Sequence, residues 1–261
     1  MTAPGAAVRP ARSQAWRSFA AQARVELLLS ARRVENLLVT ILIPLLLLVF
    51  FSSVQLLPPP PGGGRQVDQV VPGILALAIV STGMVSLGIA TAFERSYGVL
   101  KRLGGSPLPR WALLTSKTLA VVVTEAIQVV LVLCGGLLLG WSPQGGVAIA
   151  VASALPWLVL GSLAFCALGL LFAGTLRAEA VLAVANGLYL VFLLLGGIII
   201  PLDHLPAAIA VPASFLPPAQ LAGLLRGALE QGEHVDPFQA LGLAAWTVAL
   251  VALTLRTFRT E

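Results

Sequence analysis

The stretch FERSYGVLKRLGGSPLPR, residues 93–110, lies between two long apolar runs and carries Glu94, Arg95, Lys101, Arg102 and Arg110. Charged residues make up only 10% of the chain, so five charges in this short stretch are a strong local concentration. One charged side chain at the centre of a membrane-spanning helix costs on the order of 3 kcal/mol. We therefore expect residues 93–110 to leave the membrane between two spans.

The composition of the whole chain also favours a membrane protein. Hydrophobic residues make up 58% of its 261 residues, whereas a soluble domain is usually about 45–50% apolar and about 25% charged. A run of about 20 apolar residues spans a bilayer as a helix. Such runs occur at 37–57, 70–93, 147–173, 181–200 and 238–255, and a further one follows Ser106 and ends near Gly140. The sequence thus predicts an all-α membrane protein with six transmembrane helices in a domain of residues 36–261.

The N-terminal region is predicted to have two parts. Residues 1–13 are rich in Pro, Ala and Arg and are predicted to be a disordered tail. Residues 14–35 are predicted to form an amphipathic helix, because Trp16, Phe19, Ala23 and Leu27 share one face and Arg24 lies off it. A basic helix with aromatic residues on its apolar side favours the membrane interface. Packing of this helix on a partner protein is an alternative.

Proline and glycine mark several expected ends and bends. Pro44 is expected to kink the first span, and the run PPPPGGG at 58–64 to end it. Ser106 followed by Pro107 is typical of a helix start and predicts the beginning of the third span. Segment 201–239 is proline-rich, and its apolar stretches are too short to cross a bilayer, so we expect short external re-entrant helices there.

The distribution of basic residues predicts the orientation. With six spans both termini lie on one side, and that side holds fourteen of the sixteen Lys and Arg residues, leaving Arg65 and Arg226 on the other. Lys and Arg in short loops mark the cytoplasmic side. Both termini and residues 93–110 are therefore predicted to be cytoplasmic, and segment 201–239 external.

Four polar residues inside predicted spans are candidates for a translocation path or a subunit interface. Glu125 is the sole acid within a span, and Gln128 follows it by about one helical turn. An acid at this depth usually faces the protein interior or a wet cavity, although a structural glutamate is an equal alternative. Asn186 and Tyr189 on the fifth span share a face, with helix packing as the alternative.

The sequence has no sign of enzymatic chemistry of its own. Cys134 and Cys166 lie in apolar runs without a second ligand nearby, and His204 and His234 are far apart, so no metal site is predicted. No G-x-x-x-x-G-K-[ST] motif for binding nucleotide phosphates occurs. A stand-alone secondary transporter or membrane enzyme that uses Glu125 remains the alternative to a subunit driven by a partner.

Two motifs resemble the permease subunit of a type-2 ABC exporter, and the similarity covers nearly all of the chain after residue 14. The first is the family's Glu, then Gly-Thr-Leu-Lys-Arg-Leu, then Thr/Ser-Pro-Leu. It falls on Glu94, on residues 98–103 and on residues 106–108, with Val99 in place of Thr and Gly104–Gly105 before Ser106. The second is the external series Pro201, Leu205–Pro206, Leu216–Pro217 and Arg226.

The resemblance implies a site and partners. Residues of about 93–105 would form a coupling helix that docks in a separate ATPase subunit, which would hold ATP and Mg; an ordinary solvated loop is the alternative. Its contacts with the ATPase would be Glu94, Arg95, Tyr97, Gly98, Leu100, Lys101, Arg102 and Leu103. The N-terminal helix would lie along the inner membrane surface and also touch the ATPase, and its site residues would be Trp16, Phe19 and Arg24.

The resemblance further implies an assembly and a location. Two permeases would pair around a central path, and Pro201, Pro206, Pro217 and Arg226 would belong to its external cap. The expected protein is a subunit of a complex in a bacterial cell membrane, with no cofactor of its own and no nucleic-acid partner. The scarcity of lysine, separately, suggests a GC-rich genome. Its expected substrate is an amphiphilic drug or antibiotic, or a lipid.

Overall fold

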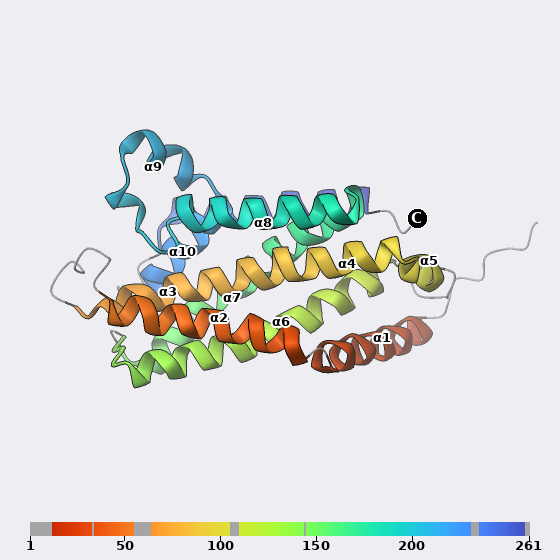
Figure 1. Ribbon diagram of the computed structural model, residues 1–261, viewed down its shortest axis with the longest axis horizontal. Helices are drawn as coiled ribbons and strands as arrows, with labels where there is room; N and C mark the ends of the chain where they lie inside the picture. The colour runs from red at the N-terminus through yellow and green to blue at the C-terminus, as the bar shows by residue number, and fades with distance from the viewer. Residues whose placement is uncertain are drawn as a thin grey trace, which may run out of the picture.

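The computed structural model describes residues 12–32, 34–54, 64–104, 110–143, 145–230 and 235–258. Within these ranges the regular structure is entirely helical, without a β-strand. Figure 1 shows an elongated bundle in which the long helices run side by side along one direction. The predicted all-α class is confirmed.

Five helical segments are long and apolar enough to cross a membrane. They are Gln66–Ser96 (α3, η1 and α4), Trp111–Leu138 within α6, Val147–Thr175 (α7), Ala178–Leu195 (α8) and Pro237–Thr257 (α11). They overlap the second to sixth predicted spans. The first predicted span, 37–57, corresponds to α2 (Val34–Ser53), a continuous helix around Pro44 whose apolar part is the shorter segment Thr40–Ser53.

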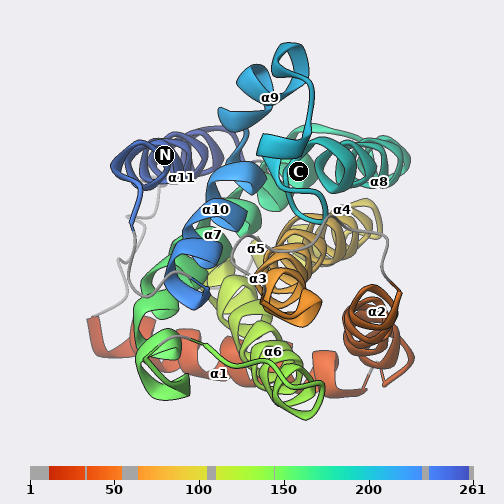
Figure 2. The same cartoon turned by 90° about the vertical axis from the view of Figure 1, so that its left-hand side faces the viewer.

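The second span is the central helix of the bundle. It consists of α3 (Gln66–Ile79), the π-helical segment η1 (Val80–Ser86) and α4 (Leu87–Ser96). Its apolar window is 83% buried, against 22–50% for the other four candidates. Figure 2 shows α3 and α4 in the middle of the bundle, with α2 and α8 on one side and α7 and α11 on the other.

Glycine allows the central helix to pack closely against its neighbours. A Cβ on Gly169 of α7 would lie 2.6 Å from the carbonyl oxygen of Gly83 in η1. A Cβ on Gly73 of α3 would lie 2.0 Å from the carbonyl oxygen of Ile198. Real Cβ atoms do not approach this closely, so only glycine fits at these crossings.

The segment after α8 differs from its prediction. The fifth span was expected to reach residue 200, but α8 ends at Leu195, followed by Gly196 and by Gly197 with φ of +61°. Beyond η2 (Leu202–His204), α9 (Ala207–Ser214) and α10 (Pro217–Leu229) form a pair bent by 89°. Together, but not separately, these two helices are long and apolar enough to count as a sixth, broken span.

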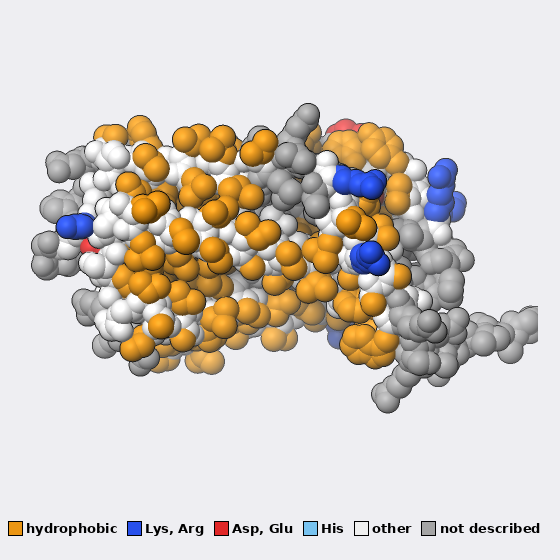
Figure 3. Space-filling view, turned by 90° about the horizontal axis from the view of Figure 1, so that it is seen from below, with side chains coloured by type: hydrophobic (Ala, Val, Ile, Leu, Met, Phe, Trp, Pro, Cys, Tyr) orange, Lys and Arg blue, Asp and Glu red, His pale blue; other side chains and the backbone are white. Residues whose placement is uncertain are grey.

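The chain alternates between two ends of the bundle. One end, which we call the α5 end, holds α1 (Arg12–Arg32), α5 (Val99–Gly104) and the last turn of α11, and the opposite α9 end holds α9 and α10. In Figure 3 hydrophobic side chains cover the middle of the molecule, and the Lys and Arg side chains gather toward its ends. An apolar middle of this kind on the face that Figure 3 shows is the surface expected of a protein that spans a bilayer.

Several predicted features fall outside the described residues. They are the tail up to residue 11, most of the Pro-Gly run at 58–64, and the expected helix start at Ser106 and Pro107. Helix α1 begins at Arg12, so the last two residues of the predicted tail 1–13 are helical, and it ends at Arg32, inside the predicted boundary at residue 35.

Candidate functional site

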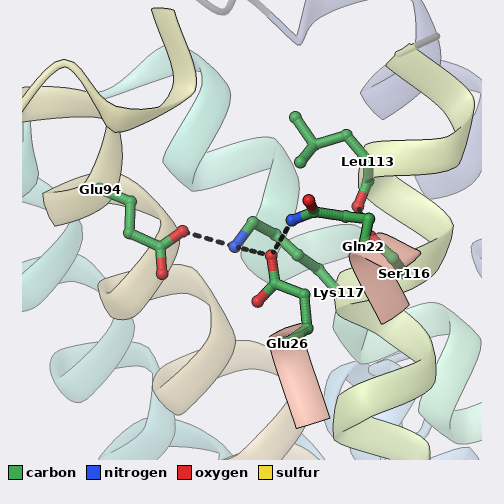
Figure 4. Close-up of polar contacts among 6 residues, drawn as sticks. All are labelled: Gln22, Glu26, Glu94, Leu113, Ser116 and Lys117. Atoms are coloured by element: carbon green, nitrogen blue, oxygen red, sulfur yellow. Dashed lines mark hydrogen bonds and ion pairs between the residues drawn. The ribbon is translucent and has the colours of Figure 1, made fainter. Parts of the chain in front are cut away.

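Three helices meet at a buried ion cluster near the α5 end. Nζ of Lys117, on α6, lies 3.0 Å from Oε1 of Glu26 on α1 and 2.5 Å from Oε2 of Glu94 on α4. Gln22 donates a hydrogen bond of 2.9 Å from Nε2 to the same Glu26 oxygen. Figure 4 shows the Lys117 ammonium group between the two carboxylates. We call Glu26, Glu94 and Lys117 the ion cluster.

The cluster binds the N-terminal helix to the bundle. The Lys117 side chain is 4% exposed, and those of Glu26 and Glu94 are 11% and 18% exposed. Pairing of these charges stabilises the fold, because an unpaired charge in a buried position is strongly destabilising.

A cavity of about 540 Å³ lies beside the cluster, between α2, the central helix and α8. We call it the α4 cavity. Its lining is mostly apolar and aromatic, with hydroxyl and amide groups among it. The lining residues are Thr40, Ile43, Pro44, Leu77, Ser81, Val85, Ser86, Ile89, Ala90, Phe93, Glu94, Tyr97, Asn186 and Tyr189. Of these described residues, Glu94 alone is charged.

A smaller cavity of about 100 Å³ connects this site with the ion cluster. It is lined by all three cluster residues, and it shares Thr40, Ser86, Ala90 and Glu94 with the α4 cavity. Thr91 also lines it and is fully buried, with no hydrogen-bond partner for its hydroxyl group. Glu94 therefore belongs to the cluster and to both cavities.

The structure separates the four residues predicted to line a path. Asn186 and Tyr189 line the α4 cavity together, as their shared face predicted, with Asn186 Nδ2 donating to the Leu182 carbonyl at 2.8 Å. Glu125 does not line it. Its side chain is 3% exposed and accepts a hydrogen bond from Ser162 on α7, so it faces the α6–α7 contact.

Gln128 has a structural position between helices. Its Oε1 accepts a 3.0 Å hydrogen bond from the hydroxyl of Thr82 in η1, and its Nε2 donates a 2.7 Å bond to the carbonyl of Thr40 in α2. This buried amide joins α2, η1 and α6. Glu125 and Gln128 thus line neither of the two cavities, and the role of these four residues in a path or a subunit interface stays a prediction.

The predicted coupling segment divides at a turn. Helix α4 ends at Ser96, Gly98 has φ of +72°, and α5 follows from Val99. Tyr97 is 74% exposed and Lys101 and Arg102 are also exposed, so these side chains are accessible at the α5 end. Arg95 donates a 2.6 Å hydrogen bond from Nη2 to the Leu176 carbonyl.

Leu100 has a different environment from the one expected of a partner contact. It is fully buried and belongs to an apolar cluster with Leu113 of α6 and Phe258 after α11. Leu100 therefore anchors α5 to its own bundle and is not accessible to another protein. The side chain of Leu103 lies outside the described part of the chain.

The aromatic residues of α1 pack on α6. The Phe19 ring centroid lies 5.7 Å from that of Trp16 and 6.2 Å from that of Trp111, which opens the α6 span, and Arg24 is exposed. Figure 2 shows α1 lying across the direction of the other helices. Aromatic contacts and the ion cluster thus fix α1 at two points along α6.

The predicted cap residues lie at the α9 end. Pro201 precedes η2, Pro206 precedes α9 and Pro217 opens α10. Arg226 on α10 donates to the carbonyls of Gly197 and, at 3.1 Å, of Ile198. These bonds fix the turn after α8 against α10.

Burial raises the pKa of Glu230, near Arg226, to about 7. The positive charge of Arg226 lowers this pKa, and the negative charge of Asp68 raises it further. Glu230 follows the last residue of α10 and stands outside the span candidates. No group of three metal-ligating side chains occurs among the residues that the structure describes.

A comparison with protein families identifies the family to which this helical arrangement belongs. The family model of the ABC-2 type transporter matches residues 17–227, which include α1, the central helix, α5 and both cavities. The chain belongs to the ABC-2 type transporter family. An ABC-2 permease is the multi-pass membrane component of an ABC transporter, and the family implies an ATPase partner. No curated protein sequence matches this ABC-2 permease.

Sequence inspection missed the ion cluster and identified only one of its members. Glu94 was singled out as part of a charged loop, whereas Glu26 and Lys117 were not predicted to pair. A signal was present: Glu26 is an acid in a basic helix, and Lys117 is a lysine among apolar residues near the start of a span. Neither signal identifies the partner.

Proposed function

We propose that this ABC-2 permease forms the path of an ATP-driven exporter, which moves a hydrophobic or amphiphilic substrate out of the cytoplasm. The α4 cavity is the observation that carries the proposal. Its volume of about 540 Å³ lies within the range of about 300–1,000 Å³ of small-molecule sites. It combines an apolar and aromatic wall with a few hydroxyl and amide groups, as a site for an amphiphile requires.

The α5 end is the proposed cytoplasmic side and the docking surface for the ATPase. The described basic residues other than Arg65 and Arg226 lie toward this end, in agreement with the positive-inside rule. Exposed Tyr97, Lys101 and Arg102 offer an aromatic and cationic surface for a groove of the partner. ATP and Mg would be bound by that partner. The permease itself would lie in a bacterial cell membrane.

Force on α5 would be transmitted to the spans by packing. Leu100 holds α5 against Leu113 of α6, and Gly98 joins α5 directly to α4. The ion cluster connects α4 and α6 with α1, which we propose lies at the membrane interface and also contacts the ATPase. The alternative of an ordinary solvated loop would need neither connection.

The bent pair α9–α10 is proposed to be a re-entrant cap. Trp246 Nε1 donates a 2.9 Å hydrogen bond to the Phe215 carbonyl at the bend. Trp246 lies nine residues after Pro237, the first residue of α11, which corresponds to roughly 14 Å along an α-helix. This depth favours a hairpin that enters the membrane from the external side and returns.

A second permease is proposed to close the α4 cavity. Helices α2 and α8 both line the cavity, and Figure 2 shows these two helices on the same side of the molecule. Both expose large apolar side chains, such as Leu46 at 57% and Leu194 at 67%. Pairing through this side would place two such cavities around a shared path.

Co-purification of the full chain from its native membrane tests the proposal. We expect an ATPase subunit to purify with the permease, and its ATP hydrolysis to drive transport in proteoliposomes. The double variant Lys101→Glu/Arg102→Glu should lose the ATPase, whereas Arg256→Glu, another exposed basic position at the α5 end, should retain it. Transport driven by an ion gradient without any ATPase would establish the secondary-transporter alternative instead.

A further inference from the structure

We propose that a groove between α10 and α11 binds a lipid with an uncharged, hydroxyl-bearing headgroup, and that Gln220 recognises its hydroxyl groups. This groove shares no lining residue with the α4 cavity, so the inference goes beyond the proposed function and does not depend on it. Two observations support it: a buried amide oxygen without a partner, and the uncharged lining of the groove beside this oxygen.

The groove has a volume of about 540 Å³ and follows one face of α11. Its lining along this helix includes the small residues Gly242, Ala245 and Ala249 and the rings of Phe238 and Trp246. None of the described lining residues carries a formal charge. Because a charge without a partner is costly away from water, we expect an uncharged ligand with an apolar body.

Gln220 on α10 brings an unsatisfied hydrogen-bonding group to the groove. Gln220 is 2% exposed and lines the groove, and its Oε1 is buried without a hydrogen-bond partner among the described residues. A buried acceptor that lacks a donor is destabilising, so a ligand that supplies the donor gains affinity. The neighbouring hydroxyl groups of a sugar or glycerol headgroup can donate to Oε1 and accept from Nε2 of the same amide.

A second glutamine provides a comparison within the same pair of helices. The Gln220 side chain packs on Gly242 of α11, and the Gln239 side chain of α11 packs on Gly223 of α10, so that a Cβ on either glycine would clash with the facing amide. Of the two glutamines, Gln220 lines the groove and Gln239 does not. The two contacts are therefore alike in packing and differ in their access to a ligand.

The position of Gln220 fits the level of a lipid headgroup. Gly242, on which its amide packs, lies five residues after Pro237, the first residue of α11, which corresponds to roughly 8 Å along an α-helix. Each headgroup region of a bilayer is about 5–8 Å thick, so a helix that starts at the membrane surface reaches the hydrocarbon boundary here. Ala245 and Ala249 continue the groove toward the bilayer centre, where an alkyl chain would lie.

Binding of dodecyl glucoside to the full chain in lipid nanodiscs tests the inference. The radiolabelled probe is used below its critical micelle concentration, and its binding is measured above that to empty nanodiscs. We expect saturable binding, and about tenfold weaker competition by the tetra-O-methyl ether of the probe, which keeps the ring and the chain but donates no hydrogen bond. Free glucose should not compete, because it lacks the alkyl chain that the groove buries.

Variants separate recognition from packing. Gln220→Leu should weaken binding of the probe by about tenfold, whereas its Tm without the probe should stay equal or rise, because an unsatisfied buried group is removed. Gln239→Leu is the matched control and should bind as the unaltered chain does. Gly242→Ala should weaken binding by displacing the Gln220 amide, and Gly223→Ala, which meets the Gln239 amide in the same way, should not.

The location of the bound probe provides a second readout. A photoreactive diazirine in the alkyl chain should label α11 near Ala249. Labelling confined to α2 and α8, which line the α4 cavity, would place the probe in the proposed path and contradict this inference.

Other results would also overturn the inference. They are absence of saturable binding, equal competition by the methyl ether, competition by free glucose, equal losses in Gln220→Leu and Gln239→Leu, or a clear fall in the Tm of Gln220→Leu, which would show a packing role instead. The binding assay does not need the ATPase. A chain that binds the probe in this groove but has no ATPase partner would contradict the proposed function alone.

Discussion

Lys117 and Glu26 form an ion pair with a nitrogen-to-oxygen distance of 3.0 Å that joins the N-terminal helix to α6. Their side chains are 4% and 11% exposed, so the pair is largely withdrawn from water. The same ammonium group pairs with Glu94 on α4. One lysine therefore connects α1 to the span that ends at the exposed loop.

Removing this lysine should destabilise the protein. Lys117→Met removes the ammonium group that pairs with the largely buried Glu26 and the partly buried Glu94, and breaking a buried pair in this way typically costs about 3–5 kcal/mol. We expect a clear fall in Tm, measured by tryptophan fluorescence during heating in detergent. Lys117→Arg keeps the charge and should lose less. An additional Glu94→Gln change should restore part of the loss, because it removes the charge of one of the two acids that pair with Lys117.

Gly73 should not tolerate a methyl group. Its Cβ would lie 2.0 Å from the carbonyl oxygen of Ile198, a backbone atom that cannot rotate away as the end of a flexible side chain can. Gly73→Ala should therefore lower the Tm markedly. The matched control is Gly187→Ala in α8, where a Cβ meets nothing within 4 Å and where alanine favours the helix by up to about 1 kcal/mol. Equal effects of the two changes would show that α3 and the turn at Ile198 are not in close contact.

Ser162 should be important for stability through Glu125. Ser162→Ala removes the hydroxyl that donates to the buried carboxyl group, which costs about 1–3 kcal/mol when the remaining group stays unsatisfied. Ser142→Ala, at an exposed position, should have little effect. In the double variant with Glu125→Leu, the loss from Ser162→Ala should become smaller. An unchanged loss would show that the two side chains act independently.

Glu230 should make stability depend on pH at the α9 end. Burial raises its pKa from 4.5 to about 7, against the lowering effect of Arg226 and with a raising effect of Asp68. The folded protein thus binds this proton more tightly than the unfolded chain. The stability that this group contributes is fully present below pH 4.5, decreases as the pH rises toward 7, and stays constant above that.

Thermal unfolding between pH 4.5 and 8 checks this dependence. We expect the Tm of the unaltered chain to fall across the interval from about pH 4.5 to 7 relative to Glu230→Gln, which carries no titrating group at this position. Glu179→Gln, at an exposed position of α8, serves as the control and should leave the slope unchanged. If the Tm of the unaltered chain and that of Glu230→Gln changed in parallel with pH, the burial of the Glu230 carboxyl group would be contradicted.

The spans and the exit of the charged stretch could be predicted because each depends on local composition. Segments 147–173 and 238–255 agree closely with α7 and α11, since about 20 apolar residues are the length that a bilayer requires. The end of α8 at Leu195 could not be predicted from hydrophobicity, because Ile198 to Ile200 continue the apolar run. The hydrogen bonds from Arg226 on α10 to the carbonyls of Gly197 and Ile198 hold this segment as a turn after α8.

Which side of a helix faces which neighbour was decided only by packing. Leu100 lies in the charged stretch, yet it is buried against Leu113. Glu125 and Glu94 both resembled functional acids, but only the rotation of α6 and α4 within the bundle directs the first to Ser162 and the second to the α4 cavity.

The sequence by itself therefore determined that the chain crosses a membrane as helices and where its charged loop leaves the apolar region. The tertiary structure decided the ion cluster and the cavity. Lys117 lies 23 residues from Glu94 along the chain and much farther from Glu26. Hydrophobic length is a property of one segment, whereas pairing between such distant charges depends on how separate helices turn and pack against one another.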